Sequence, residues 1–199
     1  MRTTAPLTAD YLFNMPPFDG YQFELVRGRL LVREGPIFKH GIIAGELLVT
    51  LAVYVNTHQL GRCVPEAAYH LERNPDTVRG PDVSFVSTAR LPATLPERGY
   101  GDIIPDLAVE VRSPNDRTRY LAKKVEMYLQ NGVRMVWLVE PKKRTITVHE
   151  VGKDPIQLGE HDVLDGGDVV PGFRYEIAEL FKWPPAGYAG SAGRPAPPG

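Results

Sequence analysis

The sequence predicts an α/β sandwich, in which a mixed β-sheet is flanked by helices. Three observations support this prediction: an apolar helical stripe in the first third, several alternating strand-like runs after it, and a strand–helix–strand step in the second half. The helical part of that step has about a dozen residues, which suits a crossover between two parallel strands.

The 199 residues fit one domain with additions. Residues 1–20 are expected to form an irregular lead-in, because Pro16 and Pro17 interrupt any helix. Residues 21–183 are expected to form a single domain. Residues 184–199 consist mainly of Pro, Gly and Ala, which predicts a disordered tail.

An added N-terminal β-hairpin is predicted over residues 21–34, with Arg27-Gly28 as its turn. A helix is predicted over residues 40–58, because apolar residues recur there at four-residue steps. Gly61 lies just past its end, where a C-terminal glycine is common. The apolar residues of the helix are Ile43, Leu47, Leu51 and Val55.

Three strands are predicted next, over residues 63–71, 81–87 and 106–113, with a long loop at 88–105 before the last. In the last strand Glu110 and Arg112 face away from the side that carries Leu107, Val109 and Val111.

A turn with helix-capping residues is predicted at 113–116, before a helix over about 118–131 that Asn131-Gly132 ends. Its buried stripe is Leu121, Val125 and Tyr128. The apolar run RMVWLVEP predicts a strand buried on both faces, and TITVHEV predicts its hairpin partner. The segment DVVPGFRYEIAELF is expected to close the fold.

The formal net charge is −1, from 23 basic and 24 acidic side chains, so the whole chain has no electrostatic attraction to nucleic acid or an anionic membrane. Any such contact requires a local basic patch. Cys63 is the single cysteine, which fits a reducing compartment. The N-terminus lacks an apolar signal core, and no apolar run reaches the roughly 20 residues of a membrane span. The expected location is cytoplasmic, with no membrane partner.

Two carboxylates are candidate metal ligands. Asp82 starts one predicted strand and Glu110 lies in the middle of the next. Neighbouring strands lie about 4.8 Å apart, so carboxylates at matching heights can bind one hard cation such as Mg²⁺. Asp82 is also explained as a strand-start residue with its carboxylate in water. An unpaired Glu110 is costly to bury in an apolar strand, so a structural ion pair is its alternative explanation.

Six motifs occur in order between residues 21 and 181: ELVRGRL, His40, TVRGPDVSFVS, PDLAVEVRSPNDR, KKVEMYLQNGV and MVWLVEP. Each is weak alone, but the ordered set resembles the Uma-type restriction endonuclease family of the PD-(D/E)XK nuclease superfamily. The resemblance covers nearly everything except the lead-in and the tail. It implies a restriction-endonuclease-like (PD-(D/E)XK) sandwich.

The resemblance assigns roles to individual residues. Asp82 matches the aspartate of the PD motif and Glu110 the second acidic residue, so both are implied metal ligands and catalytic residues. The superfamily usually has a lysine at the position of Arg112, which can hold a phosphate but cannot act as a general base. The resemblance implies that this lysine has moved to Lys124, which is catalytic and leans toward the sheet. An aspartate that often precedes this lysine is replaced by Tyr120.

Three further residues match the family or lie nearby. Glu24 matches a recurrent glutamate of the opening hairpin and is implied to assist catalysis at a metal-bound water; its alternative is a surface strand residue. Glu66 is an accessory candidate, because its predicted strand is expected to neighbour that of Asp82. His40 matches a recurrent histidine, and a lone histidine at a helix start is more often a capping group than a catalyst. Arg112 is likewise an accessory candidate.

Basic residues cluster at the start of the second long helix, at Arg117, Arg119 and Lys123. They are candidates for nucleic-acid contact, although a solvated surface is the usual explanation of such a cluster. Lys123 is the rival of Lys124 but points roughly 100° around the helix. A lysine in a partly desolvated site can have a lowered pKa, which would suit proton transfer at Lys124.

The expected function is Mg²⁺-dependent endonuclease cleavage of phosphodiester bonds in DNA, with Mn²⁺ as an alternative ion. One alternative is a nuclease fold retained as a DNA- or partner-binding module without catalysis. Another is hydrolysis of a different phosphate ester. The oligomeric state stays open, and a homodimer is one candidate.

Overall fold

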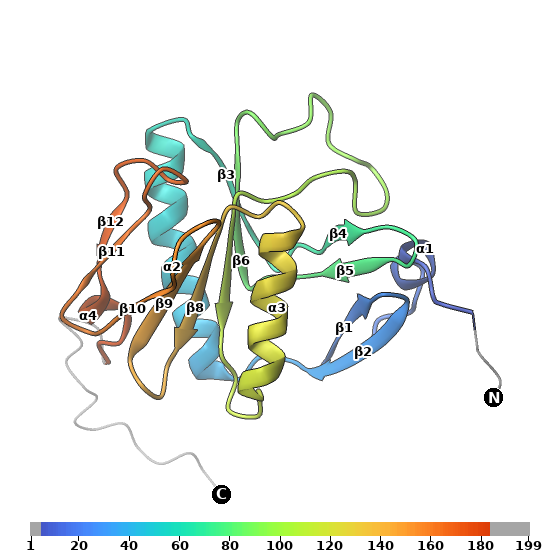
Figure 1. Cartoon of the computed structure of the whole chain (residues 1–199), viewed down its shortest axis with the longest axis horizontal. Coiled ribbons are helices and arrows are strands. Elements are labelled where there is room, and N and C mark those ends of the chain that lie inside the picture. Colours follow the sequence, from blue (N-terminus) through green and yellow to red (C-terminus); the bar gives the residue numbers. More distant parts are fainter. Residues whose placement is uncertain (1–4, 184–199) are drawn as a thin grey trace, which may run out of the picture.

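The computed structural model describes residues 5–183, and its centre is a six-stranded mixed sheet with a long helix on each face (Figure 1). Helix α2 (Phe38–Thr57) lies behind the sheet and α3 (Thr118–Gln130) lies in front of it. The predicted α/β sandwich is therefore confirmed. In spatial order the strands are β10 (Ile156–Leu158), β9 (Thr145–Glu150), β8 (Met135–Glu140), β7 (Leu107–Val111), β6 (Val83–Ser87) and β3 (Gly61–Pro65).

A second sheet contains the predicted N-terminal hairpin, whose two strands pair from Tyr21↔Glu34 to Val26↔Arg29. The strand order in this sheet is β2-β1-β5-β4. The four strands of this sheet are β1 (Tyr21–Val26), β2 (Arg29–Glu34), β4 (Tyr69–Glu72) and β5 (Thr77–Arg79). The other elements are a separate strand pair, β11 (Val163–Asp165) and β12 (Arg174–Glu176), and two short helices, α1 (Ala9–Phe13) and α4 (Ile177–Leu180).

The β7–α3–β8 step is a parallel crossover, as predicted, and it fixes the centre of the sheet. Strand β8 is buried on both faces: Trp137 packs in the core on the α2 side and Val136 in the core on the α3 side. Leu121, Val125 and Tyr128 are the buried apolar residues of α3, as expected. Burial of apolar side chains on both faces explains why β7 and β8 contain almost continuous apolar runs.

Helix α2 packs its apolar row, Ile43, Leu47, Leu51 and Val55, into the main core. By length and composition alone α2 could cross a membrane, with a mean hydropathy of 1.4 over its most apolar window. This differs from the sequence-based expectation of no such run. Core helices of globular proteins have the same character, and the row of contacts with the sheet accounts for the apolar residues on that side of α2.

Several boundaries predicted from sequence are wrong. Residues 63–71 do not form one strand: the chain bends after Pro65, and β3 and β4 belong to different sheets. The lead-in is not wholly irregular, because α1 forms there and the Thr8 hydroxyl accepts a hydrogen bond from the Tyr11 N–H at 3.1 Å. Gly61 begins β3 and does not cap α2; Gln59, with φ of 54°, has the left-handed conformation there.

Two more differences concern short segments. The turn at 113–116 supplies no side-chain cap to α3, whose N-cap is Arg117. Asp116 instead accepts a hydrogen bond from the Ser113 N–H at 2.9 Å, which closes the turn itself. Strands β5, β10 and β11 were not predicted, because three residues are too few to show an alternating pattern. The expected disordered tail at 184–199 lies outside the described residues.

Substitution of Gly28 by alanine is expected to destabilise the protein by more than about 1 kcal/mol. Gly28 has φ of 73° in the β1–β2 turn, and a Cβ there would lie 2.2 Å from the Cβ of Pro6. Its N–H and carbonyl also join the turn to Asp76 and Leu7. Urea unfolding of Gly28→Ala measures the loss. Gly20→Ala is the matched control, because Gly20 has φ of 80° but open space around it; equal losses would show that the contact with Pro6 adds nothing.

Candidate active site

Asp82 and Glu110 meet at one end of the central sheet. β6 and β7 are antiparallel with Val83 opposite Val109, so the same register continued by one residue places Asp82 opposite Glu110. The Asp82 N–H donates to the Val109 carbonyl at 3.0 Å, and Asp82 Oδ2 accepts from the Val111 N–H at 2.6 Å. These two bonds attach Asp82 to the strand that carries Glu110.

Glu110 is 3% exposed and points toward α3. Its carboxylate accepts hydrogen bonds from Lys124 Nζ at 2.9 Å and from the Tyr128 hydroxyl at 2.8 Å. Burial raises the pKa of Glu110 to about 7; the Lys124 ammonium opposes this rise, and the negative charges of Asp82 and Glu24 add to it. Glu110 is thus a buried carboxylate whose pKa is set by burial, by one neighbouring cation and by two neighbouring carboxylates.

Lys124 is 2% exposed and lies between two carboxylates. Its Nζ is 2.7 Å from Glu110 Oε1 and 3.0 Å from Glu24 Oε1. Burial alone would lower the pKa of Lys124, but the two carboxylates outweigh burial and raise it. The lowered pKa expected for this lysine is therefore wrong, and Lys124 is a permanent cation. Lys123, by contrast, is exposed, as its position on the helix predicted.

Glu24 from β1 is buried, so its interpretation as a surface strand residue is excluded. Its partners include Arg79 Nη1 at 2.6 Å and the Tyr120 hydroxyl at 2.9 Å, besides Lys124. Burial would raise the pKa of Glu24, but the charges of Lys124 and Arg79 outweigh burial and lower it to about 2. The hairpin thereby brings an ionised carboxylate into contact with the Lys124 ammonium.

Sequence analysis missed Arg79 and did not explain Tyr120. Arg79 is 3% exposed at the end of β5, and its Nη1 also donates to the Tyr120 hydroxyl at 2.8 Å. The Tyr120 hydroxyl therefore takes part in the hydrogen-bond network around Glu24, at the position where the family often has an aspartate. No local signal indicated that Arg79 is buried, because its strand has only three residues.

His40, at the start of α2, binds Asp82 from the other side. Its Nε2 is 3.0 Å from Asp82 Oδ1, and its Nδ1 is 3.3 Å from the Ser113 hydroxyl. Burial disfavours the charged imidazolium, but the hydrogen bond and charge of Asp82 outweigh burial and raise the pKa of His40. His40 is therefore a hydrogen-bonding partner of a candidate ligand.

Two accessory candidates lie elsewhere. Glu66 is exposed in the bend between β3 and β4, so its predicted strand position is wrong; only its N–H reaches Asp82, donating to the carbonyl at 3.2 Å. Arg112 follows the end of β7, and its guanidinium binds Glu140, the Asp116 carbonyl and the Thr118 hydroxyl. The Arg112 guanidinium is thus held by residues outside the Glu110–Lys124 group.

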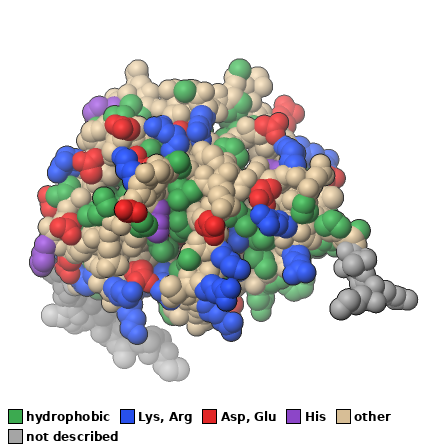
Figure 2. Space-filling model, viewed as in Figure 1, with side chains coloured by type: hydrophobic (Ala, Val, Ile, Leu, Met, Phe, Trp, Pro, Cys, Tyr) green, Lys and Arg blue, Asp and Glu red, His purple; other side chains and the backbone are tan. Residues whose placement is uncertain are grey.

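Arg117, Arg119 and Lys123 are all exposed around the start of α3. Figure 2 shows Lys and Arg side chains gathered at the lower edge of this face, among scattered acidic side chains. Their role in nucleic-acid contact stays a prediction.

The donor set fits a hard divalent cation. Among residues 5–183 no three Asp, Glu, His or Cys side chains form a group that could hold a metal ion. Mg²⁺, however, usually takes one or two carboxylates and fills its other positions with water. Each carboxylate oxygen has two lone pairs, so Asp82 and Glu110 keep acceptor capacity beyond their present hydrogen bonds. A cation between them would also offset the negative charges that raise the pKa of Glu110.

Comparison with known proteins decides the family. Residues 9–178 match the Uma2 family, described as "Putative restriction endonuclease". The chain belongs to this family. A solved structure from Anabaena variabilis ATCC 29413, described as a putative nuclease belonging to DUF820, is similar with a TM-score of 0.75 and 22% identity over 88% of this chain and 98% of that one. This likeness shows the restriction-endonuclease-like fold that the resemblance implied. No curated protein matches the chain.

Proposed function

We propose that this Uma2 family member is a Mg²⁺-dependent endonuclease that hydrolyses phosphodiester bonds in DNA, with Asp82 and Glu110 holding the ion. Family membership supports a nuclease. The observation that carries the finer proposal is the buried Glu110 carboxylate, opposite Asp82 in register and hydrogen-bonded to a buried lysine. Such an arrangement is costly for stability alone, because buried ion pairs seldom offset their own desolvation.

Each side chain has a distinct task in this proposal. Asp82 and Glu110 would hold the Mg²⁺, which would supply polarisation of a phosphoryl oxygen and a water molecule of lowered pKa. Lys124 stays protonated, so it stabilises negative charge on the phosphoryl oxygens and does not remove a proton. Glu24 holds the Lys124 ammonium in place through an ion pair of 3.0 Å. His40 holds one oxygen of Asp82, and the Val111 N–H holds the other.

A second candidate function is a nuclease fold that binds nucleic acid or a partner without cutting. One observation favours it: Lys124 and Tyr128 occupy both oxygens of Glu110, and Arg112 is engaged by Glu140. In this case the carboxylate–lysine group is purely structural. Metal binding and cleavage distinguish the two candidates.

Glu110→Gln is expected to reduce Mg²⁺-dependent cleavage of DNA by at least about a hundredfold. Glutamine keeps the size of the side chain and a hydrogen-bonding oxygen but removes the charge that a cation needs. The measurement is single-turnover cleavage of labelled duplex and single-stranded DNA, and of RNA, with Mg²⁺ or Mn²⁺. The same ions should raise the melting temperature of the wild type and not of Glu110→Gln, because a ligand stabilises the state that binds it.

Glu126→Gln is the matched control, since Glu126 lies exposed on α3 and accepts a hydrogen bond from the Gln130 amide at 3.1 Å. It should cleave at the wild-type rate. Equal cleavage by wild type and Glu110→Gln would reject the proposed site. A wild type that binds the metal ion but cuts none of the three substrates would favour the second candidate.

A further inference from the structure

A cavity of about 530 Å³ lies beside the candidate active site, between the start of α2, the segment after β7 and the β8–β9 turn. Its charged lining is predominantly basic, with four cationic side chains and one acidic one, in a chain whose net charge is −1. These side chains are Lys39, Arg112, Glu140, Lys142 and Lys143. The cavity is therefore a local basic site of the kind that the overall charge balance requires for contact with a polyanion.

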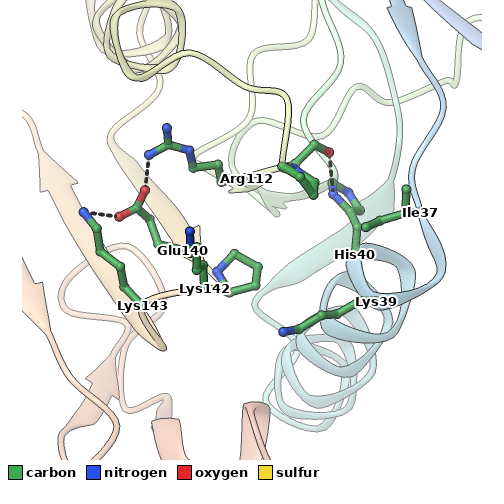
Figure 3. A pocket seen from close by; sticks show the side chains of 10 residues that line it. Ile37, Lys39, His40, Arg112, Glu140, Lys142 and Lys143 are labelled. Atoms are coloured by element: carbon green, nitrogen blue, oxygen red, sulfur yellow. Dashed lines mark hydrogen bonds and ion pairs between the residues drawn. The ribbon is translucent and has the colours of Figure 1, made fainter.

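Two of these cations are not neutralised. Glu140 pairs with Arg112 and with Lys143 Nζ, the latter at 2.7 Å. Lys39 and Lys142 make no ion pair within residues 5–183, and the sequence outside that range contains no Asp or Glu. Figure 3 shows the Lys39 side chain reaching from α2 toward the cavity, with Lys142 across from it.

The cavity adjoins the candidate metal ligands through a single side chain. His40 lines the cavity and places its Nε2 3.0 Å from Asp82 Oδ1. The cavity is therefore next to the candidate metal ligands, with the His40 imidazole between it and the Asp82 carboxylate.

A second cavity of about 410 Å³ shares Lys39 and Pro141 with the first and is mainly apolar. Two aromatic residues that line it are exposed to solvent: Phe38 is 81% exposed and Trp183 is 67% exposed. Exposed aromatic side chains next to a basic groove are typical of sites for unpaired nucleic acid, because each base can stack on an aromatic ring while the backbone follows the cations.

We propose that the two adjoining cavities bind an unpaired nucleic-acid strand next to the bond that is cut, with phosphates at Lys39 and Lys142 and a base stacked on Phe38. The volumes suit nucleotide-sized groups. This inference rests on the proposed function for the position of the cut, but binding of the strand can be measured without it. The substrate then needs a single-stranded segment on one side of the scissile bond.

The test is fluorescence anisotropy of a labelled single-stranded 12-mer and of a duplex of the same length, in EDTA so that no cleavage occurs. Lys39→Gln/Lys142→Gln should bind the single strand about tenfold more weakly, and the slope of log K against log salt should fall by about 1.4, or 0.7 for each phosphate contact. Phe38→Ala should weaken single-strand binding about tenfold and duplex binding much less.

Two controls remove the same number of positive charges and one aromatic ring outside the cavities. Arg73→Gln/Lys153→Gln removes two exposed charges outside both cavities, and Phe18→Ala removes an aromatic ring that is 65% exposed in the lead-in. Controls that equal the wild type, with the losses above, support the inference even if no cleavage is found. Unchanged single-strand affinity and salt slope in the cavity variants would overturn it even if the wild type cleaves. A change of oligomeric state in Phe38→Ala without loss of binding would also overturn it, and would assign the aromatic patch to a second copy of the chain.

Discussion

Lys124→Gln is expected to lower single-turnover cleavage of DNA by about a hundred- to thousandfold, the usual effect of removing one well-placed electrostatic group. Lys124 is the buried cation in contact with Glu110, and its raised pKa keeps it charged throughout the working range of pH. Glutamine retains hydrogen-bond donors toward Glu110 but has no charge for the phosphoryl oxygens. The rate should therefore fall while binding of Mg²⁺, followed by its effect on the melting temperature, persists.

Lys123→Gln is the control, because Lys123 is exposed on the same helix and the same charge is lost. It should keep nearly the full rate at matched salt. Lys124→Ala is less informative, since it removes the hydrogen-bond donors as well as the cation that Glu110 and Glu24 share, a loss of about 3–5 kcal/mol in stability. We therefore expect Lys124→Ala to fold less stably than the wild type. Lys124→Gln also removes the cation but keeps hydrogen-bond donors, so its smaller loss of stability is measured by urea unfolding beside the rate. Equal cleavage by Lys124→Gln and wild type would show that Lys124 has only a structural role.

Much of the fold follows from apolar spacing. The four-residue steps of α2, the alternation in β1, β2 and β7, and the apolar run of β8 each predicted an element that the structure contains. The crossover was predictable because parallel neighbouring strands need a connection of about a dozen residues or more, usually a helix, and α3 supplies it. The same spacing predicted that Lys124 is buried and Lys123 exposed, since neighbouring helix positions differ by about 100°.

The electrostatics of the site could not be predicted in this way. Glu24 and Arg79 are 55 residues apart in sequence. Their strands, β1 and β5, become neighbours only when the second sheet forms. Strand β5 is too short for its pattern to show, so the buried environment of Arg79 had no local signal. The pKa of Lys124 depends on Glu24 as well as Glu110, and that contact exists only once the hairpin has docked. Long-range pairing therefore decided the protonation states, while local spacing decided the elements.

Glu24→Gln is expected to destabilise the protein by about 3 kcal/mol at pH 7, and the loss should shrink as the pH falls. A shift of one pKa unit corresponds to about 1.4 kcal/mol, and the pKa of Glu24 is lowered from 4.5 to about 2 in the folded protein. Because the folded pKa lies below the unfolded one, this stability is fully present above pH 4.5. It is lost as the pH falls through the folded value near 2, so less than half should remain at pH 3.

Urea unfolding of the wild type and Glu24→Gln at pH 7, 5 and 3 measures the effect as a difference between the two proteins. The difference is needed because Glu110 titrates in the opposite sense: burial raises its pKa to about 7, so its ionisation lowers stability as the pH rises from 4.5 to 7. The Glu24 charge itself adds to the rise of the Glu110 pKa, so the contribution of Glu110 differs between the two proteins near pH 7. The comparison of pH 5 with pH 3, where Glu110 is largely protonated in the folded state, therefore tests Glu24. Glu97→Gln, in the exposed loop before β7, should show no loss at any of the three pH values. A loss in Glu24→Gln that stays constant from pH 7 to pH 3 would show that Glu24 stabilises the fold by packing, and that the charges of Arg79 and Lys124 contribute nothing through it.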